Sequence, residues 1–168
     1  MDRRTKHLAH GAMIAALYVV LTHLQNMIFP ESASFMIQFR ASEALCVLAF
    51  FTPAAIYGLA VGCLVFNLTF AGALPLDLLV GSLATLMAAW GMWKTRNWKA
   101  LEIPFFGLLM PAATNAVLVG WELTVYIGGG FGINALCVAL GELGVLLTLG
   151  VLLYRVMKKR RLDVLIFG

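Results

Sequence analysis

Residues 44–76 have the sequence ALCVLAFFTPAAIYGLAVGCLVFNLTFAGALPL, a run of 33 residues that contains no Asp, Glu, Lys or Arg. A bilayer core about 30 Å thick is crossed by ~20 apolar residues of α-helix, so this run is too long for one straight span. Thr52-Pro53 divides it, because proline lacks a backbone N–H and clashes with the preceding turn. We therefore expect a short helix before this proline and a full-length helix after it.

Further charge-free windows lie on both sides of this run, over 7–30, 78–93, 103–121 and 123–141, with a shorter apolar run over 143–154. They predict an all-α membrane protein with six transmembrane helices in a single integral membrane domain over 1–168. The helices are expected at about 8–28, 41–52, 54–72, 76–93, 104–126 and 132–156. The second would span only ~18 Å at 1.5 Å per residue, so it must be capped by loop structure or line a cavity.

The composition of the 168 residues excludes most soluble classes of protein. Hydrophobic residues make up 62% and charged residues 12%, whereas a soluble domain has roughly 45–50% apolar and about 25% charged residues. The three cysteines lie inside apolar runs, where they fit neither a disulfide framework nor a metal site. A soluble enzyme, a disordered segment and a nucleic-acid binder are therefore excluded, and a multi-pass protein of the cell membrane remains.

Basic residues predict the orientation in the membrane. They occur before the first expected helix, between the fourth and fifth, and after the sixth. These residues are Arg3, Arg4, Lys6, Lys94, Arg96, Lys99, Arg155, Lys158, Lys159, Arg160 and Arg161. An even number of helices places all three groups on one side, which the positive-inside rule makes cytoplasmic. We therefore expect both termini in the cytoplasm and interpret the basic clusters as an orientation signal.

The acidic and amide residues of the other half predict a polar pocket for a small solute. Glu142 is the deepest, about eleven residues into the sixth helix, with Asn134 on the same helical face. A carboxylate at that depth must be paired, protonated or functional. The candidate substrate-binding residues of this half are Arg40, Glu43, Asn67, Asp77, Asn115, Glu122 and Glu142.

Structural roles compete with binding at several of these positions. Asp77 is placed to cap the fourth helix, and Glu122 lies close enough to a helix end to be solvated. Asn67 and Asn115 are suited to hydrogen bonds between helices. Arg40 is placed to pair with Glu43 or Glu142.

Catalytic and nucleotide-binding motifs are missing from the sequence. There is no His-Glu-x-x-His metal motif, no Gly-x-Ser-x-Gly elbow and no other metal-ligand spacing. The glycines of 128–132 are not followed by Lys-Ser/Thr, so we expect a turn there rather than a phosphate loop. The chain is therefore expected not to be an enzyme, and any active transport must draw energy from a partner or an ion gradient.

Small residues on the first helix indicate a close helix contact. Gly11, Ala12, Ala15 and Ala16 form two overlapping small-xxx-small pairs, which let membrane helices approach closely. From the residues alone, this contact is either with a partner protein or within the chain.

Three segments resemble the QueT family. They are Gln38-Phe39-Arg40-Ala41-Ser42-Glu43-Ala44-Leu45, Pro53-Ala54-Ala55-Ile56-Tyr57-Gly58-Leu59 and Gly62-Cys63-Leu64-Val65-Phe66-Asn67. Asp77 with the following Gly81-Ser82-Leu83-Ala84-Thr85-Leu86, and Pro111 with Asn115, add to the likeness. The resemblance runs from the first helix to Glu142, and the Gln-Phe-Arg-x-Ser-Glu segment is its most specific part.

The resemblance implies a substrate-binding S component of an energy-coupling factor (ECF) transporter. Such a protein captures a vitamin-like solute at the outer side and docks on a transmembrane T component driven by two ATPases, so ATP is used by partners and no cofactor is expected in this chain. The implied substrates are queuosine precursors or queuine, which are 7-deazaguanines. Ala12 and Ala16 match the family's docking surface, and residues 29–42 are expected to form a lid.

The chemistry of a deazaguanine suits these residues. A carboxylate accepts two parallel N–H donors from the guanine edge, and we expect Glu142 or Glu43 to do so. Arg40 would position a carboxylate or bond the carbonyl oxygen, and an amide such as Gln38 would bond the O6 and N7 side. Aromatic side chains suited to stacking on the ring are Phe39, Phe66 and Trp121.

Three other functions are consistent with the sequence. The chain is alternatively an S component for another small vitamin or purine-like solute, or a stand-alone secondary transporter that uses Glu142 as a proton site. An intramembrane enzyme is the least favoured, because no nucleophile–base pair is recognisable.

Overall fold

The computed structural model describes residues 2–30, 39–70, 72–73, 75–100 and 102–168. This part of the chain is all-helical, as expected, and contains seven α-helices with a 3₁₀ segment (η1) and a π-helical turn (η2). In chain order the elements are α1 (Arg3–Ile28), η1 (Ala41–Phe50), α2 (Ala54–Thr69), α3 (Asp77–Thr95), α4 (Phe105–Tyr126), α5 (Phe131–Val145), η2 (Leu146–Gly150), α6 (Val151–Lys159) and α7 (Leu162–Phe167).

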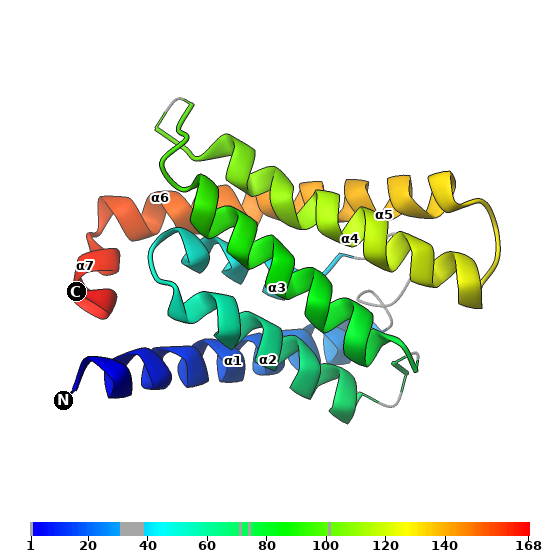
Figure 1. Ribbon diagram of the computed structural model, residues 1–168, viewed down its shortest axis with the longest axis horizontal. Helices are drawn as coiled ribbons and strands as arrows, with labels where there is room; N and C mark the ends of the chain where they lie inside the picture. Colours follow the sequence, from blue (N-terminus) through cyan, green and yellow to red (C-terminus); the bar gives the residue numbers. More distant parts are fainter. Residues whose placement is uncertain (1, 31–38, 71, 74, 101) are drawn as a thin grey trace.

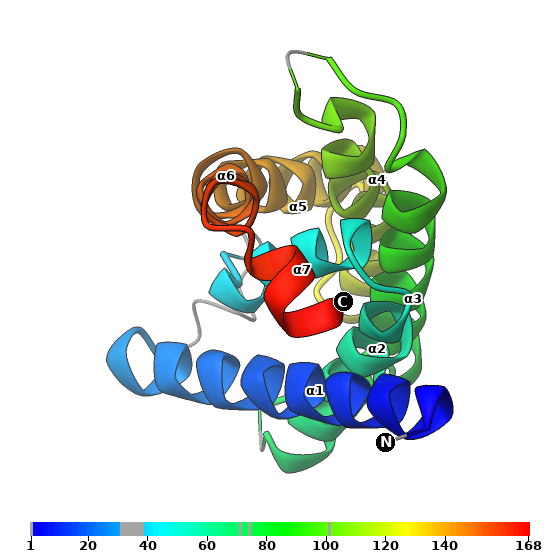
Figure 2. The same cartoon turned by 90° about the vertical axis from the view of Figure 1, so that its left-hand side faces the viewer.

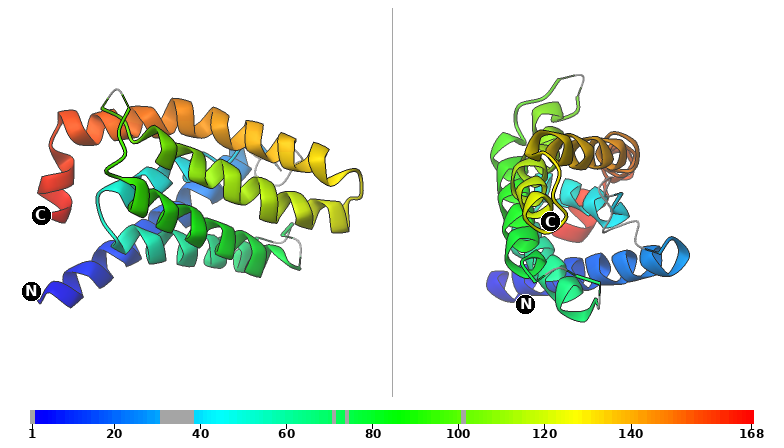
Figure 3. Two further views of the ribbon diagram at one scale, coloured as in Figure 1. Left: turned by 45° about the horizontal axis from the view of Figure 1, so that its top comes forward. Right: turned by 90° about the vertical axis from the view of Figure 1, so that its right-hand side faces the viewer.

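The long helices run side by side, and both chain termini lie at the same end of the bundle (Figures 1 and 3). We call this the termini end. It also holds the connection between α3 and α4, whereas the turn between α4 and α5 lies at the opposite, far end. That turn follows the expectation for the glycines of 128–132, because Gly128 and Gly129 adopt φ of 82° and 77°.

Three helices are long and apolar enough to cross a membrane: α1, α4, and the continuous helix Phe131–Lys159 that α5, η2 and α6 form together. The shorter apolar helices η1 and α2 lie among them. A chain with several such helices is a multi-pass membrane protein.

The segment η1 occupies the centre of the bundle (Figure 2). It contacts α1 to α6, and its residues from Ser42 to Phe50 are buried. We expected an α-helix over 41–52, but the 3₁₀ segment ends at Phe50, ahead of Pro53. At ~2.0 Å per residue a 3₁₀ helix extends further than an α-helix of equal length, at ~1.5 Å per residue. The tighter winding therefore lets a short segment reach deep between its neighbours.

The contact between α1 and α2 depends on two glycines. A Cβ added at Gly58 would lie 2.6 Å from the carbonyl oxygen of Gly11, and one at Gly62 would lie 2.8 Å from the Cβ of Tyr18. Side chains at these positions would push the helices apart. The close helix contact predicted for α1 is therefore made, on one of its faces, within the chain.

The helix α7 was not expected from the sequence. Arg161 adopts a left-handed conformation (φ 54°) that ends α6 and turns the chain. The turned segment is held by the Lys158 Nζ–Asp163 Oδ2 ion pair at 2.7 Å and by an edge-on contact of Phe167 with His10. The termini end is thus closed by a short helix after the last long one.

Candidate functional site

Five Asp, Glu or Arg side chains in the described part of the chain are buried: Arg40, Glu43, Asp77, Glu122 and Glu142, each 8% exposed or less. They come from separate elements. Arg40 precedes η1, Glu43 lies in its first turn, Asp77 opens α3, Glu122 lies near the end of α4, and Glu142 lies in α5. We call this set the buried charge cluster.

Gln25 of α1 fixes the chain on both sides of Arg40. Its Nε2 donates to the Phe39 carbonyl, and its Oε1 accepts from the Ala41 N–H at 2.6 Å. The guanidinium of Arg40 lies within electrostatic range of Glu43 and Asp77. Arg40 is therefore held as the positive charge of the cluster.

Glu43 is fully engaged by its neighbours. Its Oε1 accepts from the Tyr18 hydroxyl at 2.7 Å, and its Oε2 accepts from the Cys46 thiol at 3.1 Å. Beside it, Thr22 donates to the Tyr18 carbonyl at 2.7 Å and pairs with the Ser42 hydroxyl at 2.8 Å. The Tyr18–Glu43 and Thr22–Ser42 bonds join α1 to η1.

Glu142 is only half engaged. Its Oε1 accepts from Asn115 Nδ2 at 2.7 Å, whereas its Oε2 is buried with no hydrogen-bond partner among the described residues. The carboxylate lies within electrostatic range of Glu43 and Arg40. A buried acceptor of this kind is costly unless a ligand, a proton or water satisfies it.

Glu122 is less satisfied still. The side chain is 0% exposed, and both carboxylate oxygens have no hydrogen-bond partner within the described part of the chain. It lies near Asp77 and within electrostatic range of Arg40. The interpretation that Glu122 is solvated at a helix end is therefore wrong, because the packing of α4 turns it inward.

Asn67 anchors the start of α3. Its Nδ2 donates to the Asp77 carbonyl at 2.7 Å, and its Oδ1 has no partner among the described residues. Asp77 is the first residue of α3, and the residue at the cap position is Leu76. The carboxylate of Asp77 is thus part of the cluster and does not serve as the N-cap.

The cluster holds four carboxylates against one guanidinium, so full ionisation would leave three unbalanced negative charges. Charged groups inside a membrane are expensive and face a partner or an internal site. Protons or a cationic occupant must therefore supply the balance.

Some predicted residues lie elsewhere. Asn134 shares a helix with Glu142 but donates to Thr124 Oγ1 and the Gly128 carbonyl, both at 3.0 Å, and so fastens the turn at the far end. Of the suggested stacking rings, Phe39 and Trp121 are 44% and 51% exposed, and only Phe66 is buried. Gln38 and most of the expected lid, residues 31–38, lie outside the described residues.

The sequence reasoning missed the partners that α1 contributes. Tyr18, Thr22 and Gln25 are spaced four and three residues apart, so they share one face of the helix. The regular spacing of these polar residues along one face of α1 was the available signal. Cys46, one turn after Glu43 in η1, was also missed.

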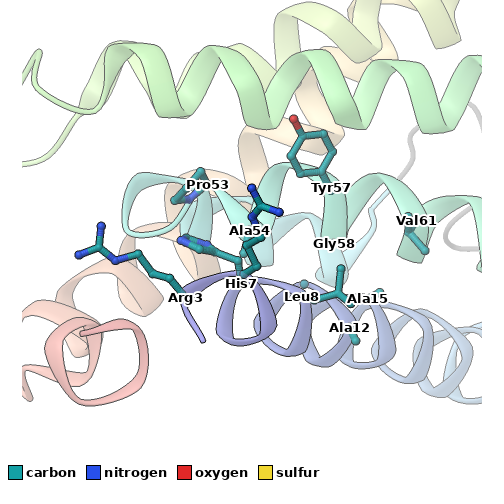
Figure 4. A pocket seen from close by; sticks show the side chains of 12 residues that line it. Arg3, His7, Leu8, Ala12, Ala15, Pro53, Ala54, Tyr57, Gly58 and Val61 are labelled. Atoms are coloured by element: carbon teal, nitrogen blue, oxygen red, sulfur yellow. The ribbon is translucent and has the colours of Figure 1, made fainter. Parts of the chain in front are cut away.

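A separate apolar groove of about 680 Å³ lies between α1 and α2 (Figure 4). Its lining includes Gly11, Ala12, Ala15, Tyr57 and Gly58. The small residues of α1 divide into two pairs, because Gly11 and Ala15 are half-buried against α2 and Ala12 and Ala16 are exposed. No residue of the buried charge cluster lines this groove.

Comparison with known proteins agrees with the motif-based resemblance. The QueT transporter family model matches residues 8–159. The queuosine precursor transporter QueT of Lactococcus lactis subsp. cremoris (strain MG1363) is 39% identical over 77 residues, which cover 45% of this chain and 43% of the relative. No solved structure matches this chain. Because the family model covers nearly the whole sequence, the chain belongs to the QueT transporter family.

Proposed function

We propose that the protein is the substrate-binding S component of an ECF-type transporter that takes up queuosine precursors or queuine. The single observation that carries the proposal is the buried charge cluster, whose carboxylates exceed their partners inside a membrane protein of this family. A flat heterocycle rich in N–H groups would donate the hydrogen bonds that these carboxylate oxygens lack.

The proposal includes six membrane spans with both termini in the cytoplasm. The two termini share one end of the bundle with the α3–α4 connection (Figure 1). These three places carry eleven of the twelve Lys and Arg residues, and the remaining one is Arg40. The positive-inside rule then makes the termini end cytoplasmic and turns the far end toward the outside.

Within this scheme Glu142 is the better candidate to read the guanine edge. Both oxygens of Glu43 already accept hydrogen bonds from Tyr18 and Cys46, whereas Glu142 Oε2 has none from a described residue. A carboxylate that accepts two parallel N–H bonds gains both strength and geometric selectivity. The Asn115 amide holds Glu142 in place for this role.

Asp77 and Glu122 form a second acidic group suited to a cationic aminomethyl substituent. Glu122 is fully buried, and Asp77 lies near it. A protonated amine bound beside them would relieve the repulsion of two neighbouring carboxylates. Arg40, which interacts electrostatically with both acids, would bond the ring carbonyl or hold a carboxylate in place.

Transport needs an energised partner in this proposal. The T component would dock on the exposed face of α1 that presents Ala12 and Ala16, next to the apolar groove. Small residues allow a partner helix to approach closely in the bilayer. ATP would be used by two partner ATPases.

The solute is tested by mass spectrometry of whatever small molecule co-purifies with the protein. Thermal unfolding with added 7-deazaguanines and other vitamins then ranks ligands, because a ligand that binds the folded state raises its stability. We expect a 7-deazaguanine to give the largest shift. A larger shift with an unrelated vitamin would assign the S component to that solute instead.

Docking is tested by Ala16→Trp, with Val20→Trp as a control on the same exposed side of α1 but outside the small-residue pairs. We expect Ala16→Trp to reduce ATP-dependent uptake to background while solute binding stays unchanged, because the bulky ring blocks helix approach. Loss of solute binding by a folded Ala16→Trp protein would contradict this division of roles.

The excess of buried carboxylates also favours a second function, proton-coupled transport without ATPases. Purified protein in vesicles decides between the two. Uptake that follows an imposed pH gradient without partner subunits would replace the S-component proposal.

A further inference from the structure

A second hollow, of about 760 Å³, opens at the termini end. Four basic side chains line it: Lys99 from the α3–α4 connection, and Arg155, Lys158 and Lys159 from α6. Glu102 and Tyr154 complete the polar lining. The hollow therefore joins basic residues that are more than fifty positions apart in the chain.

Described residues beside Lys99 hold that wall in place. Ala100 and Ile103 pair through two backbone bonds, Ala100 N–Ile103 O and Ile103 N–Ala100 O, at 2.9 and 3.1 Å. Glu102 adopts a left-handed φ of 65°, and its carbonyl accepts from the Tyr154 hydroxyl at 3.3 Å. Glu102 is thus tied directly to α6.

Positive charge in the hollow exceeds the available negative charge. Lys158 is neutralised by Asp163 at 2.7 Å, and Glu102 is the one acid among the lining residues. Arg155 and Lys159 are four residues apart on one helix face, where like charges repel. The last carbonyls of α6 favour cations, so an anion would be held by the side chains alone.

We propose that this hollow binds a phosphate group, supplied by an anionic lipid headgroup. The hollow lies where α3 and α6 end and α4 begins, which is headgroup depth for a multi-pass protein. Basic pockets between membrane helices are suited to such headgroups. The inference is independent of which solute the cluster binds and of the transport partner.

The test compares two double variants that remove equal charge from the termini end. Arg155→Ala with Lys159→Ala alters the hollow, whereas Lys6→Ala with Arg160→Ala removes basic side chains that do not line it. Thermal unfolding in detergent is followed against phosphatidylglycerol, phosphatidylcholine and inorganic phosphate.

We expect phosphatidylglycerol to stabilise the wild-type protein at lower concentrations than phosphatidylcholine does. The hollow variant should need on the order of tenfold more phosphatidylglycerol, and the control should behave as wild type. Saturation by inorganic phosphate alone, with the same dependence on the variants, would assign the site to a free anion. Equal responses of the two double variants would overturn the proposal, and single Lys159→Ala provides the same comparison if the double variant fails to fold.

Discussion

Charged side chains are buried toward one end of this bundle and mostly exposed at the other. Toward the far end, four carboxylates and Arg40 are buried and imperfectly matched. At the termini end the basic side chains are exposed, apart from Arg96, which is half-buried with its guanidinium 3.7 Å from the centre of the Trp93 ring. Exposed charges are screened by water and salt, whereas buried ones demand a partner. A buried carboxylate without a partner is therefore informative in the cluster, whereas at the termini end the hollow is the place where several basic side chains gather.

Glu142→Gln should produce the largest effect. The substitution keeps the size of the side chain but removes the charge that would accept two N–H bonds, so solute binding should weaken by about 2–5 kcal/mol. Calorimetric titration of the purified protein with a 7-deazaguanine measures this loss, and the thermal midpoint without ligand checks the fold. Normal binding by both Glu142→Gln and Glu43→Gln would refute the assignment of a carboxylate to the guanine edge.

Glu43→Ala should instead lower stability. It leaves the Tyr18 hydroxyl and the Cys46 thiol, both buried, without their acceptor, at a cost of about 1–3 kcal/mol. Unfolding in detergent measures this loss of stability. The double variant Tyr18→Phe with Glu43→Ala should recover part of the loss, because it no longer buries a hydroxyl without an acceptor. A variant of wild-type stability that no longer binds solute would move Glu43 into the binding site.

Asp163→Asn at the termini end should have the smallest effect, under ~1 kcal/mol, because Lys158 is half-exposed. The hydrogen bond from Lys158 lowers the pKa of Asp163 below its ordinary value of 3.8. The pair therefore stabilises the fold above pH 3.8, and its contribution disappears as the pH falls through the lower folded value. Unfolding of the wild-type and Asp163→Asn proteins at pH 7 and in acid measures how much stability the pair contributes at each pH. A difference that grows in acid would contradict the pairing.

The helical segments were largely predictable from the sequence. Charge-free windows and Pro53 placed the helices, and the observed α1, α2, α3 and α4 end within three residues of the expected ends. The winding of η1 was not predictable in this way, because hydropathy reports burial and not the number of residues per turn. The helix α7 was missed because its six residues are too few to show a periodic apolar face, although Leu162 and Phe167 pack against the core.

The candidate site was predictable in its acids but not in their partners. Depth in an apolar helix singled out Glu142, and burial of Glu43, Asp77 and Glu122 agrees with an interior position. Which oxygen lacks a donor depends on how Tyr18 and Asn115 reach across from other helices. Asn134 was grouped with Glu142 because both residues lie on one face of the same helix. Its amide instead hydrogen-bonds the Gly128 carbonyl in the neighbouring turn, which the helical spacing does not reveal.

By itself, the sequence determined that this chain is an all-helical membrane protein with acids at membrane depth, because transfer of side chains between water and hydrocarbon depends on composition and spacing alone. Only the tertiary structure decided which face of α1 packs against α2, which carboxylates remain unmatched, and that distant lysines share one hollow. These outcomes depend on distances of a few ångströms between segments far apart in the chain, and local patterns contain no information about such distances.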